Sequence, residues 1–184
     1  QKGMTLVFEA GQNRRDAIPL PLIPLVMVGT WLTHLFGGSA GREGVAVQIG
    51  GTLAHGLGRK FCTPAEQRVL LIAGMAAGFS GLFQTPLTAV FFALEVLIAG
   101  AMAYEALLPA LLAAGLACKT SALLGLGKFS AVLGGSAALS DGRQLAALVV
   151  LGLAFGLTGR CFSTGLQQAK RIAGERMKNP YLRI

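Results

Sequence analysis

Two long stretches of this chain contain almost no charge, and they restrict its fold more than any other feature. Residues 17–36 contain no charged side chain, and residues 69–103 contain only Glu95. Each stretch is long enough for a helix of about 20 residues, which can cross the hydrocarbon core of a membrane. A soluble all-α domain is the alternative, but its helices need a polar stripe that these stretches mostly lack. We therefore predict an all-α, polytopic membrane protein.

Composition and charge agree with this prediction. Of the 184 residues, 53% are hydrophobic and only 13% are charged, which leaves too little polar surface for a soluble domain. The formal net charge is +8, but the basic residues form short clusters at expected helix ends, such as Arg14–Arg15 and Arg59–Lys60. Such clusters are typical of juxtamembrane anchors. Nucleic-acid binding needs a continuous basic face, so we exclude it.

No residue pattern predicts a metal site, a cofactor or an enzyme. Cys62, Cys118 and Cys161 are far apart in the sequence and lack the spacing of metal ligands. No nucleophile and base fall into a recognisable arrangement. Small packing residues are the simplest interpretation of the three cysteines.

Glycine- and proline-rich breaks divide the chain into about seven helical pieces of unequal length. Thr63, Pro64 and Glu66 predict a helix start with a capping box. Some pieces are too short to cross about 30 Å of hydrocarbon, which indicates broken and re-entrant helices. The expected helices cover residues 18–36, 45–58, 64–80, 87–100, 105–124 and 143–177, with a loop at 125–142.

The break at Gly41-Arg-Glu-Gly44 places ionisable side chains between two apolar helices. Such a residue at membrane depth costs roughly 2.5–3.5 kcal/mol, so it is a candidate for function. The free N–H groups and positive dipole at the start of the second helix favour an anion. The carboxylate of Glu43 can occupy this position as a tethered anion, and its protonation would admit a free one. The alternative is that Glu43 and Arg42 form a buried pair or face a loop.

Three segments resemble the ClC channels and antiporters. Gly38-Ser-Ala-Gly-Arg-Glu-Gly44 with Val45-Ala-Val-Gln-Ile-Gly50 is similar to the anion-binding signature of that family. Phe83–Leu87 with Phe92–Glu95 resembles its next helix start, and Asn179–Arg183 resembles the junction into its second half. The resemblance implies a homodimer with one pore per subunit, in which each subunit has two inverted repeats. Residues 1–184 would then form a partial transmembrane domain, the first repeat and the start of the second.

The resemblance also assigns candidate site residues. It implies that Glu43 is the gate and proton carrier, that backbone groups near it hold the anion, and that the segment near the start of the chain lines the inner side. The anion-binding candidates are Gly41, Arg42, Glu43, Gly44, Val45, Ala46, Gly3, Met4 and Thr5.

Departures from the chloride-type pattern indicate the fluoride-exporting branch of the family. Val45 stands where chloride-type members have a proline, and Met4 stands where they have a serine. Val96 stands where chloride/proton antiporters have a second, proton-handling glutamate. The resemblance therefore implies fluoride/proton antiport by an integral protein of the bacterial inner membrane, with fluoride or chloride ions, protons and the lipid bilayer as its partners.

Two alternatives to fluoride/proton antiport remain open, and Glu95 has two possible roles. The first is a chloride channel or chloride/proton antiporter. The second is a non-transporting membrane scaffold that assembles through small residues such as Gly74, Gly78 and Gly152. For Glu95 we expect a structural role as the helix-end partner of a buried donor, with direct proton transfer as the alternative.

Overall fold

Helices are the only regular secondary structure in the described part of the chain. The computed structural model describes residues 3–12, 14, 17–39, 41–98, 100–127 and 142–176, and its ordered elements are helices. The helices are α1 (Gly3–Gly11), α2 (Leu22–Leu35), α3 (Glu43–Phe61), α4 (Pro64–Phe83), α5 (Pro86–Val96), the short 3₁₀ helix η1 (Tyr104–Ala106), α6 (Leu107–Leu123) and α7 (Gly142–Arg176). This confirms the predicted all-α class. The chain divides into two compact units, residues 1–130 and 131–184, which we describe separately.

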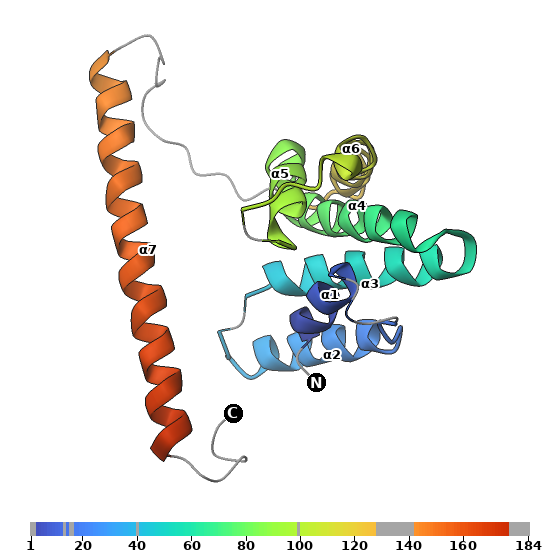
Figure 1. The fold of residues 1–184 in the computed structure, drawn as a ribbon, viewed down its shortest axis with the longest axis horizontal. Helices are drawn as coiled ribbons and strands as arrows, with labels where there is room; N and C mark the ends of the chain where they lie inside the picture. Colours follow the sequence, from blue (N-terminus) through green and yellow to red (C-terminus); the bar gives the residue numbers. More distant parts are fainter. Residues whose placement is uncertain are drawn as a thin grey trace. The chain divides into compact units, whose positions relative to one another are not determined.

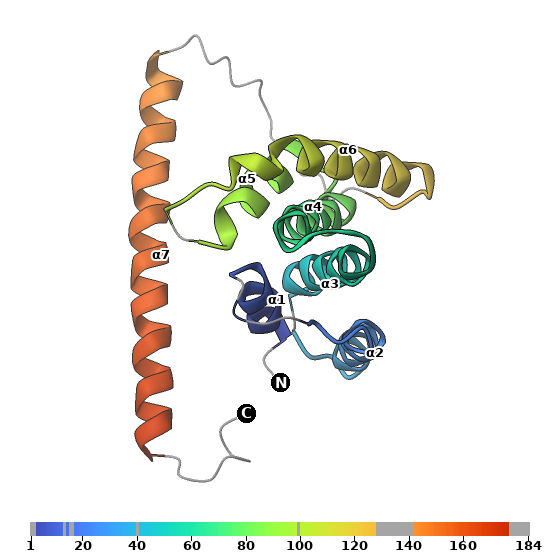
Figure 2. The same ribbon diagram turned by 45° about the vertical axis from the view of Figure 1, so that its right-hand side comes forward.

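The first unit is built around the pair α3 and α4, which lie side by side (Figures 1 and 2). α2 packs against the side of α3 that faces away from α4, and α6 packs against α4. α1 contacts α3, and α5 contacts both α4 and α6. Leu71, Ile72 and Met75 of α4 are fully buried, so this helix forms the centre of the core.

Several helix boundaries differ from the sequence prediction. α2 begins at Leu22 rather than near Ile18, because Pro19 and Pro21 disfavour helical backbone in the residues that precede them. α3 continues to Phe61 and α4 to Phe83, beyond the predicted ends. α1 was not expected as a helix. The predicted loop at 125–142 lies mostly outside the described residues.

The backbones of α3 and α4 approach each other closely at glycines. A Cβ atom on Gly74 would collide with the carbonyl oxygen of Gly50 and with Ala54. A Cβ atom on Gly78 would collide with the carbonyl oxygen of Ala46, in the first turn of α3. These contacts leave no room for a side chain, so the glycines hold the start of α3 directly against α4.

Hydrogen bonds with α6 and with the segment just after it hold the break between α4 and α5 in place. Gln84 ends α4 with a left-handed backbone (φ 55°), a conformation that a non-glycine residue adopts only when its surroundings support it. Its Nε2 atom donates to the carbonyl oxygen of Leu126 at 2.7 Å. Ser121 of α6 donates to the carbonyl oxygen of Gly81 at 2.7 Å. This arrangement determines where α5 begins.

The predicted capping box at the start of α4 is present. The backbone N–H and the hydroxyl of Thr63 both donate to Oε2 of Glu66, each at 2.8 Å. The backbone hydrogen bond, followed by the hydroxyl one, lowers the pKa of the Glu66 carboxyl from its ordinary value. The folded state therefore binds the proton less tightly than the unfolded chain does. The box stabilises the fold at neutral pH, and this contribution is lost as the pH falls through the lowered pKa.

We expect Glu66→Ala to lower the thermal midpoint of the protein in detergent at neutral pH. Because the wild-type contribution requires an ionised carboxylate, the difference between variant and wild type should shrink on acidification. Thermal unfolding of both proteins at several pH values measures this. A difference that stays constant from neutral to acidic pH would contradict the role given to the carboxylate.

The second unit is represented by one long helix. α7 has 35 residues and is therefore roughly 50 Å long, more than the roughly 30 Å of a hydrocarbon core. Its large apolar side chains, such as Leu148, Leu153 and Phe155, are exposed. Arg171 pairs with Glu175 at 3.0 Å near its end. An apolar surface on all sides is typical of a helix that lies in lipid or against other helices.

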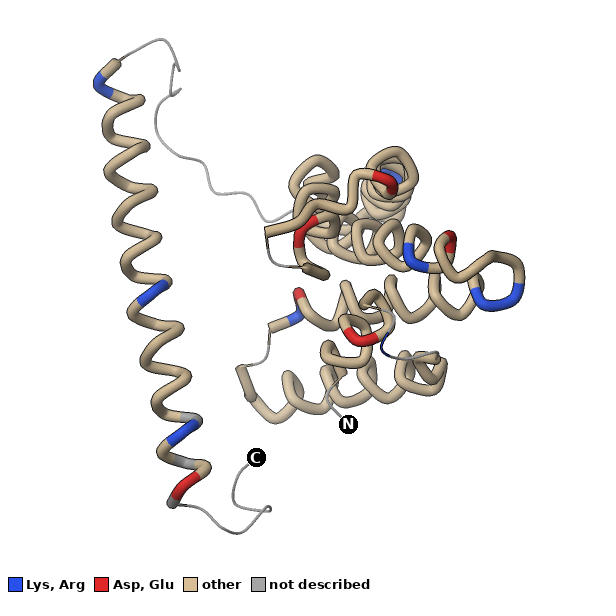
Figure 3. Tube along the Cα trace, in the orientation of Figure 1, with Lys and Arg blue, Asp and Glu red and all other residues tan. Residues whose placement is uncertain are grey.

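Two helical segments are long and apolar enough to cross a membrane. They are Tyr104–Leu123, formed by η1 and α6, and Gly142–Ala169 within α7. α2 and α5 are also apolar but shorter. Figure 3 shows that α2 has no charged residue and that the charges of α3 lie at its two ends. Full-length and short apolar helices thus occur together, as the prediction of broken helices requires.

Candidate functional site

The start of α3 is a helix terminus without a side-chain cap. Gly37, with φ of 75°, ends the turn after α2, and Glu43 is the first residue of α3. The first helical hydrogen bond runs from the N–H of Ala46 to the carbonyl oxygen of Arg42, at 3.0 Å. The N–H groups of the three preceding residues therefore have no partner within the helix. Together with the helix dipole they form a site that favours an anion.

The carboxylate of Glu43 lies over Gly41, just before this terminus. Its Oε2 atom is 2.5 Å from the position that a Cβ atom would take on Gly41. The side chain is thus folded back over Gly41, and any other residue at that position would displace it. The glycine leaves room for the carboxylate beside the backbone just before the helix, where no side chain caps the helix start.

Glu43 also lines a cavity of about 570 Å³. Phe79 and Phe83 supply aromatic rings to its lining, with ring centroids 4.7 Å apart, and Phe79 also stacks on Phe92 at 4.9 Å. Thr85 and Thr88, at the start of α5, add hydroxyl groups to the lining. Sequence analysis missed these residues, although it recognised the helix break before Pro86, which is the signal that could have pointed to them.

The start of α1 meets the start of α3. The Cγ atom of Met4 is 3.6 Å from the position that a Cβ atom would take on Gly44, so the two residues are in contact. The carboxamide of Gln48 lies against Gly3, at 2.8 Å from the equivalent position. Thr5 is exposed. Two segments almost forty residues apart in the sequence thus come together, and Met4 reaches the predicted site.

Charged residues near the site do not neutralise each other. Arg42 and Glu43 are both exposed in this part of the protein, and they make no ion pair with each other or with another described residue. The buried Arg42–Glu43 pair is therefore not found. Glu95 is also exposed, near the end of α5, and no described residue bonds to its carboxylate. Its expected role as the partner of a buried donor therefore finds no donor among the described residues.

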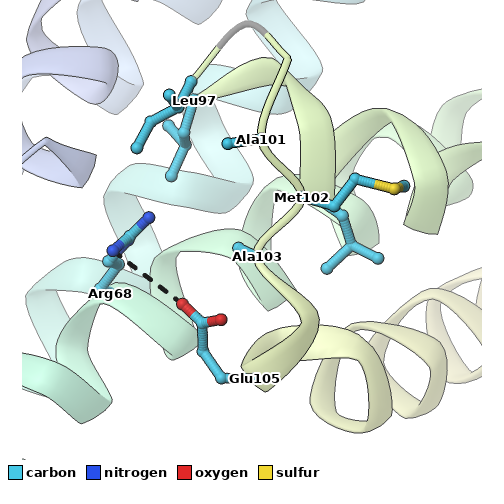
Figure 4. A pocket seen from close by; sticks show the side chains of 8 residues that line it. Arg68, Leu97, Ala101, Met102, Ala103 and Glu105 are labelled. Carbon is cyan, nitrogen blue, oxygen red and sulfur yellow. Dashed lines mark ion pairs between the residues drawn. The ribbon is translucent and has the colours of Figure 1, made fainter.

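A second pocket contains charges but is separate from the start of α3. It has a volume of about 240 Å³ and is lined by Leu97, Met102 and Arg68, among others (Figure 4). Arg68 faces Glu105 across it, with Nη1 and Oε1 3.9 Å apart. At this distance and exposure the pair contributes little stability. It shares no lining residue with the cavity at Glu43.

Comparison with known proteins identifies the family. The model of the family described as "Voltage gated chloride channel" matches residues 1–184. The chain belongs to this family. Members of the voltage-gated chloride channel family that resemble it include a chloride/fluoride channel protein of Pseudomonas syringae pv. tomato, which is 40% identical over 163 residues. That match covers 88% of this chain and 36% of the relative.

A solved structure extends the comparison to three dimensions. The crystal structure of a CLC-type fluoride/proton antiporter matches 99% of this chain with a TM-score of 0.87 and 54% sequence identity. The match covers 46% of the antiporter chain. This family member therefore has the fold of a polytopic CLC-type transporter. It spans less than half the length of either relative.

Proposed function

We propose that this chain forms part of the anion pathway of a fluoride/proton antiporter, with Glu43 as gate and proton carrier. The position of the Glu43 carboxylate supports this most directly, since it lies over Gly41 at the uncapped start of α3 and lines the cavity there. The similarity to a fluoride/proton antiporter, at 54% identity, favours fluoride and protons as the exchanged ions.

The mechanism follows from competition for one position. While Glu43 is ionised, its carboxylate takes the anion position in front of the N–H groups of Glu43, Gly44 and Val45. Fluoride is then excluded from that position. When Glu43 binds a proton, its charge is lost and it no longer competes for these donors. Fluoride then takes its place, because a small anion is stabilised by N–H groups and a positive dipole. For exchange, the proton must leave toward the side from which the fluoride came, so that the returning carboxylate expels the anion to the other side.

Other walls of the pathway lie outside the described residues. The chain spans about half of the similar antiporter, so we propose that a full-length subunit supplies the remaining anion contacts. We propose that such a subunit works as a homodimer in a bacterial inner membrane. Met4, packed on Gly44, supplies no hydroxyl to the ion on the inner side. The anion would then depend mainly on backbone donors.

A chloride or fluoride channel is the second candidate, because the Pseudomonas syringae relative is named a chloride/fluoride channel protein. In liposomes containing a full-length subunit with this sequence, we expect fluoride efflux to exceed chloride efflux by roughly tenfold or more, which corresponds to about 1.4 kcal/mol of discrimination. Fluoride efflux should also move protons in the opposite direction. Ion-selective and pH electrodes measure both fluxes. Equal fluoride and chloride fluxes would reject the fluoride preference, and fluoride flux without proton movement would favour a channel.

A further inference from the structure

A pocket at one end of the first unit contains two arginine side chains. It has a volume of about 320 Å³ and is lined by Gly11, Gln12, Arg14, Arg68 and Ile98. These residues belong to the end of α1 and the segment after it, the second turn of α4, and the segment after α5. Among the described residues, no carboxylate lines this pocket, so the charge of its lining is positive.

Hydrogen bonds hold the frame of the arginine pocket. Nε2 of Gln12 donates to the carbonyl oxygen of Leu97 at 2.8 Å, which joins the segment after α1 to the segment after α5. The backbone N–H of Arg14 donates to the carbonyl oxygen of Glu9 at 2.8 Å, which fixes the turn where Arg14 lies. A pocket that is already formed avoids part of the free-energy cost of ordering its walls around a ligand.

Both arginines have N–H donors without a hydrogen-bond partner among the described residues. Nε of Arg68 is buried and makes no hydrogen bond, and the 3.9 Å between Arg68 and Glu105 is too long for one. Arg14 is exposed and forms no ion pair with the rest of the described chain. A guanidinium group presents its donors as a planar fork, which matches two oxygen atoms of a phosphate. The pocket therefore favours an anion with several oxygen atoms.

The arginine pocket lies where apolar helices reach charged residues. The charges of α3 lie at its two ends, and Arg59 and Lys60 mark the end that leads into α4 (Figure 3). α4 begins three residues after α3 ends, so Arg68 in its second turn lies near the same end. Basic side chains at the ends of membrane helices, and basic pockets between such helices, are at the depth of lipid headgroups.

A second, more apolar pocket adjoins the arginine pocket. It is the pocket of Figure 4, and the two are neighbours because Arg68 and Ile98 line both. Apart from Arg68 and Glu105, its lining is apolar and consists of Leu94, Leu97, Ile98, Ala101, Met102 and Ala103. A ligand with both a phosphate and a hydrocarbon chain makes use of both pockets, whereas a free ion would contact only the first.

We propose that the two pockets together bind an anionic phospholipid. Arg14 and Arg68 hold its phosphate, and the first part of an acyl chain lies against Leu97, Ile98 and Met102. Phosphatidylglycerol has the required chemistry, a phosphate with two free oxygen atoms and a net negative charge. Phosphatidylcholine has the same phosphate, but its positive headgroup would lie beside the arginines and be repelled. The proposal does not depend on antiport, because a polytopic membrane fold is sufficient to bring lipid to this end of the unit.

The test measures lipid binding to a full-length subunit purified in detergent. Native mass spectrometry counts the bound lipids while the protein is titrated with dioleoylphosphatidylglycerol or, for comparison, dioleoylphosphatidylcholine. We expect Arg14→Gln and Arg68→Gln each to weaken binding of phosphatidylglycerol roughly tenfold, the usual effect of losing a hydrogen bond from a charged group. Binding of phosphatidylcholine should not change. Because Arg14 is exposed, Arg14→Gln should keep the thermal midpoint of the lipid-free wild type, which separates lost binding from lost folding.

Arg59→Gln is the matched control. Arg59 is exposed at the same end of the unit but lines neither pocket. It should bind phosphatidylglycerol as the wild type does. Equal weakening in Arg59→Gln would show a general attraction between charges and overturn the proposal, as would unchanged binding in both Arg14→Gln and Arg68→Gln. Inorganic phosphate that raises the thermal midpoint of the wild type as much as phosphatidylglycerol does would overturn the lipid and assign a free ion to the pocket.

Discussion

Replacing Glu43 with glutamine is expected to abolish the proton movement that accompanies fluoride flux. Glutamine has the same shape as a protonated glutamate, but its carboxamide neither binds nor releases a proton in the pH range of the assay and bears no negative charge. It can neither carry a proton nor compete with fluoride for the N–H groups at the start of α3. We expect the proton flux per fluoride ion to fall roughly a hundredfold or more, the usual effect of losing an acid–base group. Fluoride flux itself should persist.

The measurement uses paired fluoride and pH electrodes on liposomes that contain a full-length subunit. Glu105→Gln is the matched control, because Glu105 is an exposed carboxylate whose contact with Arg68, at 3.9 Å, lies in a different pocket. This variant should couple like the wild type. Undiminished proton flux in Glu43→Gln would contradict the gating role. Absence of fluoride flux in the wild type and in every Glu43 variant, including Glu43→Ala, would favour a non-transporting scaffold.

The second prediction with a large effect is a loss of stability when Gly78 is replaced with alanine. In an exposed helix, replacing glycine with alanine stabilises by about 0.5–1 kcal/mol. At Gly78, however, the new methyl group would collide with the carbonyl oxygen of Ala46 and approach the backbone nitrogen of Val47. Backbone atoms cannot move aside as a flexible side chain can, so α3 must shift. We expect Gly78→Ala to destabilise the protein by about 1–3 kcal/mol, as overpacking does.

Gly115→Ala is the matched control for Gly78→Ala. Both glycines lie in helices, but a Cβ atom on Gly115 would have no neighbour within 4 Å. Thermal unfolding in detergent, monitored by fluorescence, should show a lower midpoint for Gly78→Ala and an unchanged or higher one for Gly115→Ala. Equal midpoints would mean that α3 and α4 do not touch at Gly78 as described. Fluoride flux should fall in Gly78→Ala, since the start of α3 is displaced.

Sequence analysis predicted those features of the fold that depend on local chemistry. The capping box of Thr63 and Glu66 is confirmed. It could be predicted because its hydrogen bonds join residues only three positions apart. The glycine-rich break before α3 was also predicted from local sequence, although α3 begins at Glu43 and not at Val45 as predicted. The end of α4 was predicted less well, since Gln84 is held by Leu126, a residue far along the chain. α1 was missed because its short apolar segment has no recognisable cap.

Part of the candidate site could also be predicted, because some of its features depend only on local sequence. Glu43 is conspicuous as an ionisable residue between glycines and apolar helices. The proximity of distant segments, such as those of Met4 and Gly44, was predicted only through the resemblance to a known family. Phe79 and Thr88 were not predicted at all, because an aromatic or hydroxyl residue in an apolar helix has nothing to distinguish it until the cavity is seen.

The glycine contacts between α3 and α4 determine which part of the site can move during transport. Gly78 holds the peptide of Ala46 against α4, and Ala46 belongs to the turn whose N–H groups face the anion. In the proposed exchange cycle, these donors would therefore stay in place. The moving part is then the Glu43 side chain, which changes between rotamers over a stationary backbone. The proposed ion exchange at this position would then require no bending or tilting of a helix, only torsion about a few single bonds.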